Sequence, residues 1–151
     1  MLTHFLALGD LIKTQIEAKM PGAFRLVADA ADLKGVRDST QLAPACHIIF
    51  AGAKPGASLP RSRAVAWDQT WLTVVVTRSA KDPKSGAGAR ADAGLLLSAL
   101  LAPGVLAGWQ PLSDESIQPL EPVAPPAPPL LTDAGTLYVP VAWKARVAAW
   151  N

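Results

Sequence analysis

The chain has 151 residues, of which half are apolar and 17% are charged, with a net charge of +2 and a single cysteine. This length suits one domain of roughly 100–150 residues with its own core, and so small a net charge gives no general argument for binding nucleic acid or a membrane. One cysteine excludes an intramolecular disulfide, and the low charged fraction is typical of a subunit whose surface is partly covered by neighbours.

An amphipathic helix is predicted at the beginning of the chain, within residues 2–21. Its apolar positions recur every three to four residues and form one stripe. Thr3 is placed to cap this helix, and Pro21 followed by Gly22 ends it. The stripe consists of Phe5, Leu8, Ile12, Ile16 and Met20.

Neither secretion nor membrane insertion is expected. Charged side chains such as Asp10 and Lys13 interrupt the apolar residues of the first helix, which also lacks the basic start of a signal peptide. The most apolar window, residues 93–105, is shorter than the roughly 20 residues that a bilayer requires, and Pro103 and Gly104 break it. We therefore expect a protein that is made in the cytoplasm and has no membrane partner.

Several β-strands are predicted in the first half of the chain. Residues 24–28 suit a short strand, and a turn or a single helical turn follows at residues 29–35. Residues 46–50 form a β-rich run that Gly52 ends. Residues 54–60 contain two prolines and a glycine, so they are expected to be a flexible connection.

The longest strand is predicted at residues 64–79, where side chains alternate between two faces. Leu72, Val74 and Val76 share one face, and we expect them to lie in the core beneath the helices. The opposite face is expected to be half covered, and it carries Trp71, Thr73, Val75 and Thr77.

The second half of the chain combines a helix, a proline-rich segment and a closing strand. Residues 89–101 are rich in alanine and leucine and predict a helix that Pro103 ends. Residues 119–129 contain six prolines, so they are expected to be an extension or loop that cannot lie inside a sheet. Residues 136–143 predict the last strand, in which Pro140 indicates a sheet edge or a bulge.

These elements predict an α+β fold in a single domain, residues 1–151. Strands outnumber helices, and the helices lie far apart in the sequence. The expected architecture is a mainly antiparallel β-sheet with two helices packed on one face.

No residue pattern supports catalysis. Cys46 and His47 are a nucleophile and a base, but neighbours on a strand point to opposite faces and cannot hydrogen-bond to each other. His4 is the only other histidine, so one subunit cannot supply four nitrogen or sulfur ligands to zinc. Asp29 and Asp32 lie among alanines and suit a solvated turn. No enzyme activity, cofactor or metal is expected.

A glycine-rich segment, residues 86–91, matches the dinucleotide-binding pattern G-x-G-x-x-G/A and precedes a predicted helix. The pattern requires a tight turn directly after a strand and an acidic residue about 20 positions later. A polar loop, residues 79–85, separates the strand from the glycines, and residues 108–112 contain no acid. A flexible loop is the favoured interpretation, and a small nucleotide-binding protein is kept as an alternative.

Basic and tryptophan side chains are the candidates for contacts with other subunits. The basic residues cluster around the long strand without an aromatic ladder or a recognition helix, so a subunit contact or a solvated edge is favoured over nucleic-acid binding. Tryptophan is enriched in the buried centres of interfaces. The candidate subunit and tube interface consists of Arg61, Arg63, Arg78, Lys81, Lys84, Trp67, Trp71, Trp109, Trp143 and Trp150.

Short motifs in a particular order carry a family resemblance. They are an opening helix that ends near Pro21, a strand and turn at residues 24–33, Pro44-Ala-Cys-His-Ile-Ile-Phe50, Asp68-Gln-Thr-Trp-Leu-Thr-Val-Val-Val76, Gly108-Trp109-Gln110-Pro111 and Leu137-Tyr138-Val139. In these motifs and their order, nearly the whole chain resembles the tail terminator proteins of long-tailed bacteriophages. The proline-rich segment 119–129 departs from the family pattern, and we expect it to lie across a neighbouring subunit.

The resemblance implies a structural virion protein at the tail end or neck. Such a subunit forms a hexameric ring on the tail tube, stops tube polymerisation and offers a surface for head–tail joining. The implied partners are further copies of the chain, the tail tube protein and the head–tail connector protein, and genome DNA passes through the ring without specific recognition. Another neck or tail-completion protein is the alternative, because such proteins share the small size and the α+β character.

Overall fold

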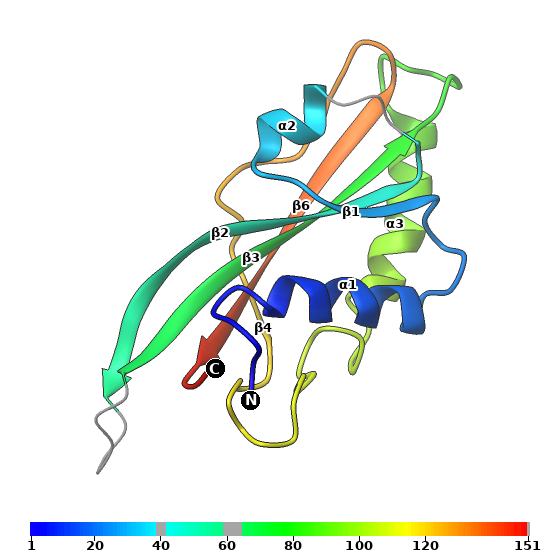
Figure 1. Cartoon of the computed structure of the whole chain (residues 1–151). Helices are drawn as coiled ribbons and strands as arrows, with labels where there is room; N and C mark the ends of the chain where they lie inside the picture. Colours follow the sequence, from blue (N-terminus) through cyan, green and yellow to red (C-terminus); the bar gives the residue numbers. More distant parts are fainter. Residues whose placement is uncertain (39–41, 59–64, 151) are drawn as a thin grey trace.

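The computed structural model describes residues 1–38, 42–58 and 65–150 (Figure 1). Over these residues the chain has the predicted α+β fold, and none of its described helices is long and apolar enough to cross a membrane. The helices are α1 (Leu8–Lys19), α2 (Leu33–Asp38) and α3 (Ala87–Leu100), and the strands are β1 (Leu26–Asp29), β2 (Ala45–Ser58), β3 (Val65–Arg78), β4 (Glu121–Val123), β5 (Leu130–Leu131) and β6 (Thr136–Val147).

All six strands belong to one sheet. Its strand order is β1-β2-β3-β6-β4, and β5 also pairs with β6. The short strand β1 runs parallel to β2, whereas the other described pairs are antiparallel. β6 pairs with β3 without interruption, from Trp67 opposite Val147 to Arg78 opposite Thr136. The prediction of a mainly antiparallel sheet is therefore confirmed.

The two longer helices, α1 and α3, cover the same face of the sheet, as predicted. Ile12 of α1 and Leu100 of α3 belong to one buried cluster that also contains Trp71 of β3. A polar contact fixes α3 to the sheet, because the hydroxyl of Thr77 donates to the carbonyl oxygen of Ala89 at 2.7 Å. The helices therefore pack against the centre of the sheet, and α1 crosses in front of it (Figure 1).

Leu72, Val74 and Val76 are buried, but they do not lie beneath the two long helices. They belong to a second cluster on the opposite face, where Val36 of the short helix α2 packs against them. The face that was expected to be half covered carries α1 and α3 instead. The predicted assignment of faces is wrong because both faces of β3 are buried, so alternation along this strand does not identify the covering element.

β2 is longer than predicted. It continues past Gly52 to Ser58, and residues 54–58, expected to be part of a flexible connection, belong to the strand. The register with β3 skips Ala51, and Gly52 adopts a φ of 131° at this bulge, a backbone conformation that favours glycine. Residues 59–60 of the expected connection lie outside the described residues.

The proline-rich segment runs along the outer edge of β6. Its residues 121–123 form β4 opposite residues 142–144, and the chain then returns to β6 through β5, opposite residues 137–138. The segment stays out of the sheet interior, as predicted, and residues 121–123 and 130–131 pair with β6 of their own subunit. β6 is flanked by β3 on one side and by β4 and β5 on the other, so it is not the edge strand that Pro140 indicated. Pro140 itself lies opposite the gap between β4 and β5, which suits its missing N–H.

α1 begins later than predicted, at Leu8, and Thr3 does not cap it. Residues 2–7 form an irregular segment that lies on the sheet. The side-chain amide of Gln69 on β3 donates to the carbonyl oxygen of Phe5 at 2.7 Å. This part-buried contact holds the start of the chain against β3.

Candidate subunit interface

Cys46 and His47 occupy neighbouring positions on β2 and point to opposite faces of the sheet. Cys46 is buried beneath α1, and burial raises the pKa of its thiol to about 12, so the reactive thiolate is scarce at neutral pH. His47 is buried on the other face, where burial lowers the pKa of its imidazole. The two groups do not form a catalytic pair. In the described ranges, no three His, Cys, Asp or Glu side chains gather around a metal position.

The glycine-rich segment 86–91 serves close packing. Gly86 precedes α3 with a φ of 68°, and a Cβ atom there would lie 2.7 Å from the side chain of Leu131. A Cβ atom at Gly88 would overlap the hydroxyl of Ser79. β3 precedes α3 and pairs with β6, which follows α3, and this pair is antiparallel. The nucleotide-binding pattern requires instead a parallel βαβ unit. The nucleotide-binding alternative therefore lacks its structural context.

Three of the five tryptophans are used inside the subunit. Trp143 is fully buried, and its indole Nε1 donates to Thr73 Oγ1 at 3.0 Å. Trp71 is also buried, and the half-buried Trp109 packs against the same cluster. The interface prediction is corrected for Trp71 and Trp143, because α1, α3 and the sheet already cover their side chains.

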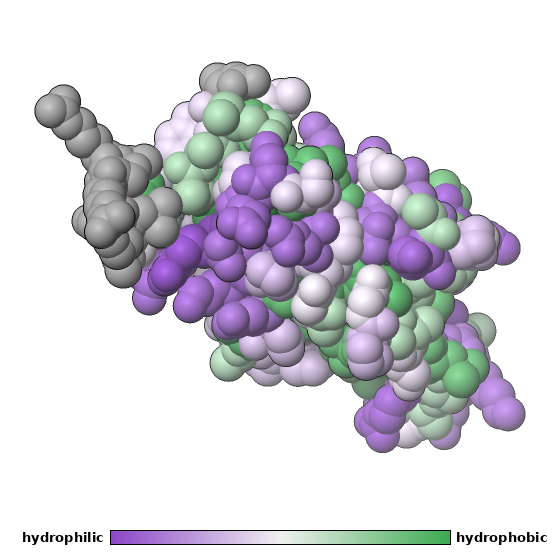
Figure 2. Space-filling model, turned by 90° about the horizontal axis from the view of Figure 1, so that it is seen from below, coloured by the Kyte–Doolittle hydropathy of each residue, from purple (hydrophilic) through white to green (hydrophobic). Residues whose placement is uncertain are grey.

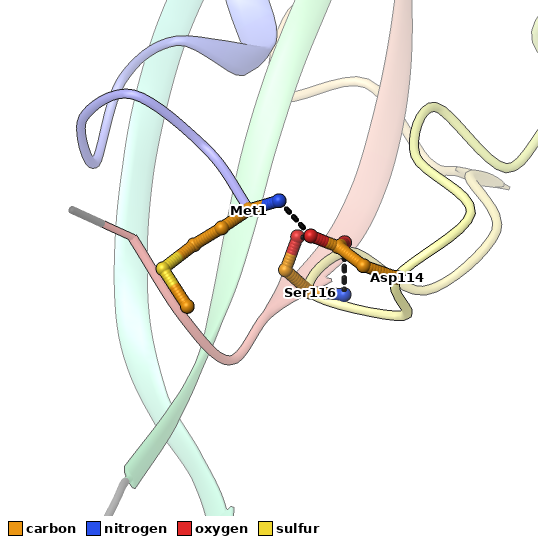
Figure 3. A network of polar contacts seen from close by, with 3 residues as sticks. All are labelled: Met1, Asp114 and Ser116. Carbon is orange, nitrogen blue, oxygen red and sulfur yellow. Dashed lines mark hydrogen bonds and ion pairs between the residues drawn. The ribbon is translucent and has the colours of Figure 1, made fainter.

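The two ends of the chain meet at one end of the sheet, beside the start of β3 (Figure 1). Leu2 pairs with Trp150 in a β-bridge. The α-amino group of Met1 forms an ion pair with Asp114, whose carboxylate also accepts the hydroxyl of Ser116 at 2.6 Å (Figure 3). Together these contacts fix the first residues against Trp150, which follows β6, and against the loop around Asp114.

Trp67 and Trp150 come together at this end and form an aromatic patch with Phe5, in which Trp150 is exposed and the other two rings are half-buried. The Phe5 ring lies 6.0 Å from Trp67 and 5.1 Å from Trp150 between ring centroids, both in edge-on arrangements. A shallow hollow beside them is lined by Val65, Trp67, Ala148, Ala149 and Trp150, without a charged side chain. We define the aromatic patch as Phe5, Leu6, Val65, Trp67 and Trp150.

Three members of the aromatic patch, Phe5, Leu6 and Val65, were not among the predicted interface residues. Phe5 fits the apolar stripe of the first predicted helix, which explains why the sequence pattern placed it in the core. Val65 stands at the beginning of a strand with mostly buried side chains and is itself 42% exposed. The bridge between residues 2 and 150 has no local sequence signal that would reveal it.

The described basic candidates lie at the opposite end of β3. Arg78 ends the strand, and Lys81 and Lys84 follow in the loop before α3; all three are exposed. Eleven residues separate Arg78 from Trp67, a distance of roughly 36 Å along an extended strand. The structure therefore does not join the basic and the aromatic candidates into one surface. Arg61 and Arg63 lie outside the described residues.

The reverse face of the sheet is polar near the aromatic patch. Arg146 Nε donates to Asp68 Oδ1 at 2.9 Å, and this hydrogen bond is the main cause that lowers the pKa of Asp68. Lys144 and Glu121 lie next to this pair in a polar hollow. Figure 2 views this end of the molecule and shows hydrophilic residues gathered next to apolar ones. The apolar surface is therefore bounded by a charged one.

The proline-rich loop, defined as residues 124–129 between β4 and β5, is a second uncharged surface. Pro125, Pro126, Pro128 and Pro129 are all exposed. The side of the loop that faces its own subunit lines an apolar hollow with Leu33, Arg37 and Tyr138.

Comparisons with known proteins cover nearly the whole chain. A family model described as phage tail terminator protein matches residues 1–149. Among solved structures, a chain of the "Virion of native gene transfer agent (GTA) particle" has a similar fold, with a TM-score of 0.53 and 17% identity over 94% of this chain and 95% of that chain. No curated protein matches the sequence.

Proposed function

Since the chain belongs to the phage tail terminator protein family, we propose that it forms a ring that caps the tail tube and stops its polymerisation. Membership in this family makes it a structural protein of the phage tail. The ring also offers the surface on which the head connector docks, and genome DNA passes through its opening. A ring of six copies is the form that the resemblance implies.

The family match over residues 1–149 is the observation that carries this proposal. The surface of the subunit agrees with it, because a ring is built from head-to-tail contacts between two unlike surfaces of the same chain. The aromatic patch and the proline-rich loop are two such surfaces, and both are apolar and uncharged. Cys46 and His47 are buried and do not form a catalytic pair, and the glycine-rich segment 86–91 is used for close packing. Neither feature supports an alternative function.

Particles made without this chain test the proposed function directly. We expect their tail tubes to grow to irregular, excessive lengths and to remain unjoined to heads, and we expect the chain supplied in trans to restore both properties. Tubes of normal length that fail only to join heads would favour another neck protein. Normal, infectious particles would contradict a role in the tail.

A further inference from the structure

We propose that the proline-rich loop of one copy binds the aromatic patch of the next copy, and that this contact closes the ring. The inference rests on the proposed function, because it requires a ring, and it adds the two surfaces that touch. The occupant of the aromatic patch is thus residues 124–129 of a second copy of this chain.

The exposed apolar side chains concentrate at these two surfaces. Nine large apolar residues are exposed in the described ranges. Six of them lie at the end that carries the aromatic patch or next to the proline-rich loop. Met1, Leu6, Val65 and Trp150 lie at the end that carries the aromatic patch, and Val123 and Leu130 flank the proline-rich loop. Single exposed apolar residues are ordinary, whereas such a gathering is typical of an interaction site.

The chemistry of the two surfaces is complementary. Proline-rich segments bind grooves lined with aromatic rings, because the rings stack on the proline faces and the restricted proline backbone loses little entropy on binding. The hollow beside Trp67 and Trp150 supplies such rings without a charged group. Residues 122–132 also contain no charged side chain, so neither partner loses a solvated charge when the two meet.

A copy cannot place its own loop in its own patch. The loop is anchored at both ends beside residues 137–144 of β6, whereas the patch lies near Val147 and Trp67. Residues 141 and 147 are roughly 20 Å apart along the strand. The inner side of the loop also lies with Leu33 and Tyr138 on the α2 face, opposite to the face that carries Phe5 and Trp67. The contact is therefore between copies.

A contact between two different surfaces has the geometry that a ring needs. Each copy offers its loop in one direction and its patch in the other, so the same contact repeats until the chain of copies closes. A contact between identical patches would instead stop at a twofold dimer. Tryptophan side chains in hollows are the residues that most often dominate such interfaces.

Paired cysteines in assembled tails test the contact. Ala124→Cys places a thiol on the loop, Ala149→Cys places one at the hollow, and the natural Cys46 is buried and does not compete. With both substitutions on one chain, oxidation is expected to give a ladder of cross-linked multimers, of which the largest contains every copy in the ring. Mixing the two single variants should give dimers only, and either single variant alone should give monomers.

Surface substitutions give an independent measurement. Trp150→Ala, and Pro125→Ala together with Pro126→Ala, are expected to reduce the fraction of capped tubes at least about tenfold, as for hot-spot residues. Leu95→Ala and Pro103→Ala are the matched controls, because both positions are exposed away from the two surfaces. The controls should cap tubes normally.

The outcomes separate the two proposals. Imaged rings without cross-linked multimers, or loops that link to a tube or connector protein, would overturn this inference and leave the ring intact. Tails without a ring of this chain would overturn the proposed function, and the inference would fall with it. Cross-linked ladders in ringed tails support both.

Discussion

Gly9 shows how a single residue sets the distance between a helix and the sheet. A Cβ atom at this position would lie 2.7 Å from the ring of Trp71, whereas a Cβ atom at Gly94 of α3 would meet nothing within 4 Å. We expect Gly9→Ala to lower the free energy of unfolding by about 1–3 kcal/mol through overpacking. Gly94→Ala, the matched control, should raise it by about 0.5–1 kcal/mol.

Urea denaturation of both variants measures these changes. Because both glycines are helical, the propensity gain is common to the pair, and the difference reports the contact with Trp71. Equal stabilisation by the two substitutions would show that α1 has room to move away from the sheet.

His47 makes stability depend on pH in a defined direction. Burial lowers its pKa in the folded chain, so the unfolded chain binds the proton more readily. The contribution of His47 to the stability of the fold is therefore fully present above the unfolded pKa of about 6.5, and it falls as the pH drops below that value. Asp68, whose pKa is also lowered, acts in the same direction only around and below its unfolded pKa of about 3.9.

We expect the free energy of unfolding to decrease between about pH 7 and pH 5, as the pH falls below the unfolded pKa of the histidine. His47→Gln removes the titrating group and should reduce this decrease. Denaturation curves of the two proteins at several pH values provide the measurement, and parallel pH profiles would show that the histidine does not carry the dependence.

At the scale of elements, β3 shows what a strand pattern can and cannot predict. Its alternation predicts the strand and its two faces, because side chains point alternately to either side. It does not predict that α1 and α3 take the face of Trp71 while α2 takes the face of Val74. That choice depends on contacts far apart in the chain, such as the one between Thr77 and Ala89.

Val74 lies at the centre of the face that α2 covers, and it is fully buried. Val74→Asp would place an unpaired charge there at a cost of several kcal/mol, which is comparable to the whole stability of roughly 5–15 kcal/mol. We expect this variant to be unfolded by circular dichroism and by proteolysis. Val65→Asp is the control, since the same change on the same strand meets solvent; a folded Val74→Asp protein would refute the burial of this face.

At the scale of the molecule, the fold class follows from the sequence more readily than the interface does. Helical spacing and strand alternation are local, so the α+β sheet with two helices on one face was predictable. Trp67 and Trp71 lie on the same face of β3, yet only Trp71 lies beneath α1. Their different exposure depends on where α1 begins, and no pattern around the tryptophans contains that information.

The aromatic patch was beyond local prediction for a related reason. It combines residues 5–6, 65–67 and 150, which come together only because the first and last residues pair with each other. The prolines of residues 119–129 were visible in the sequence, but their course along β6 depends on the pairing of β4 and β5. A surface assembled from such distant segments has no period and no spacing of its own.

We propose above all that this chain forms the ring that ends the tail tube. Symmetry-resolved imaging of assembled tail ends, with the chain marked by a small tag, tests it most directly, whether or not free subunits are monomeric. We expect six copies in one closed ring at the end of the tube that faces the head. Finding the chain elsewhere in the particle, outside a ring or in a ring with another copy number, would contradict it.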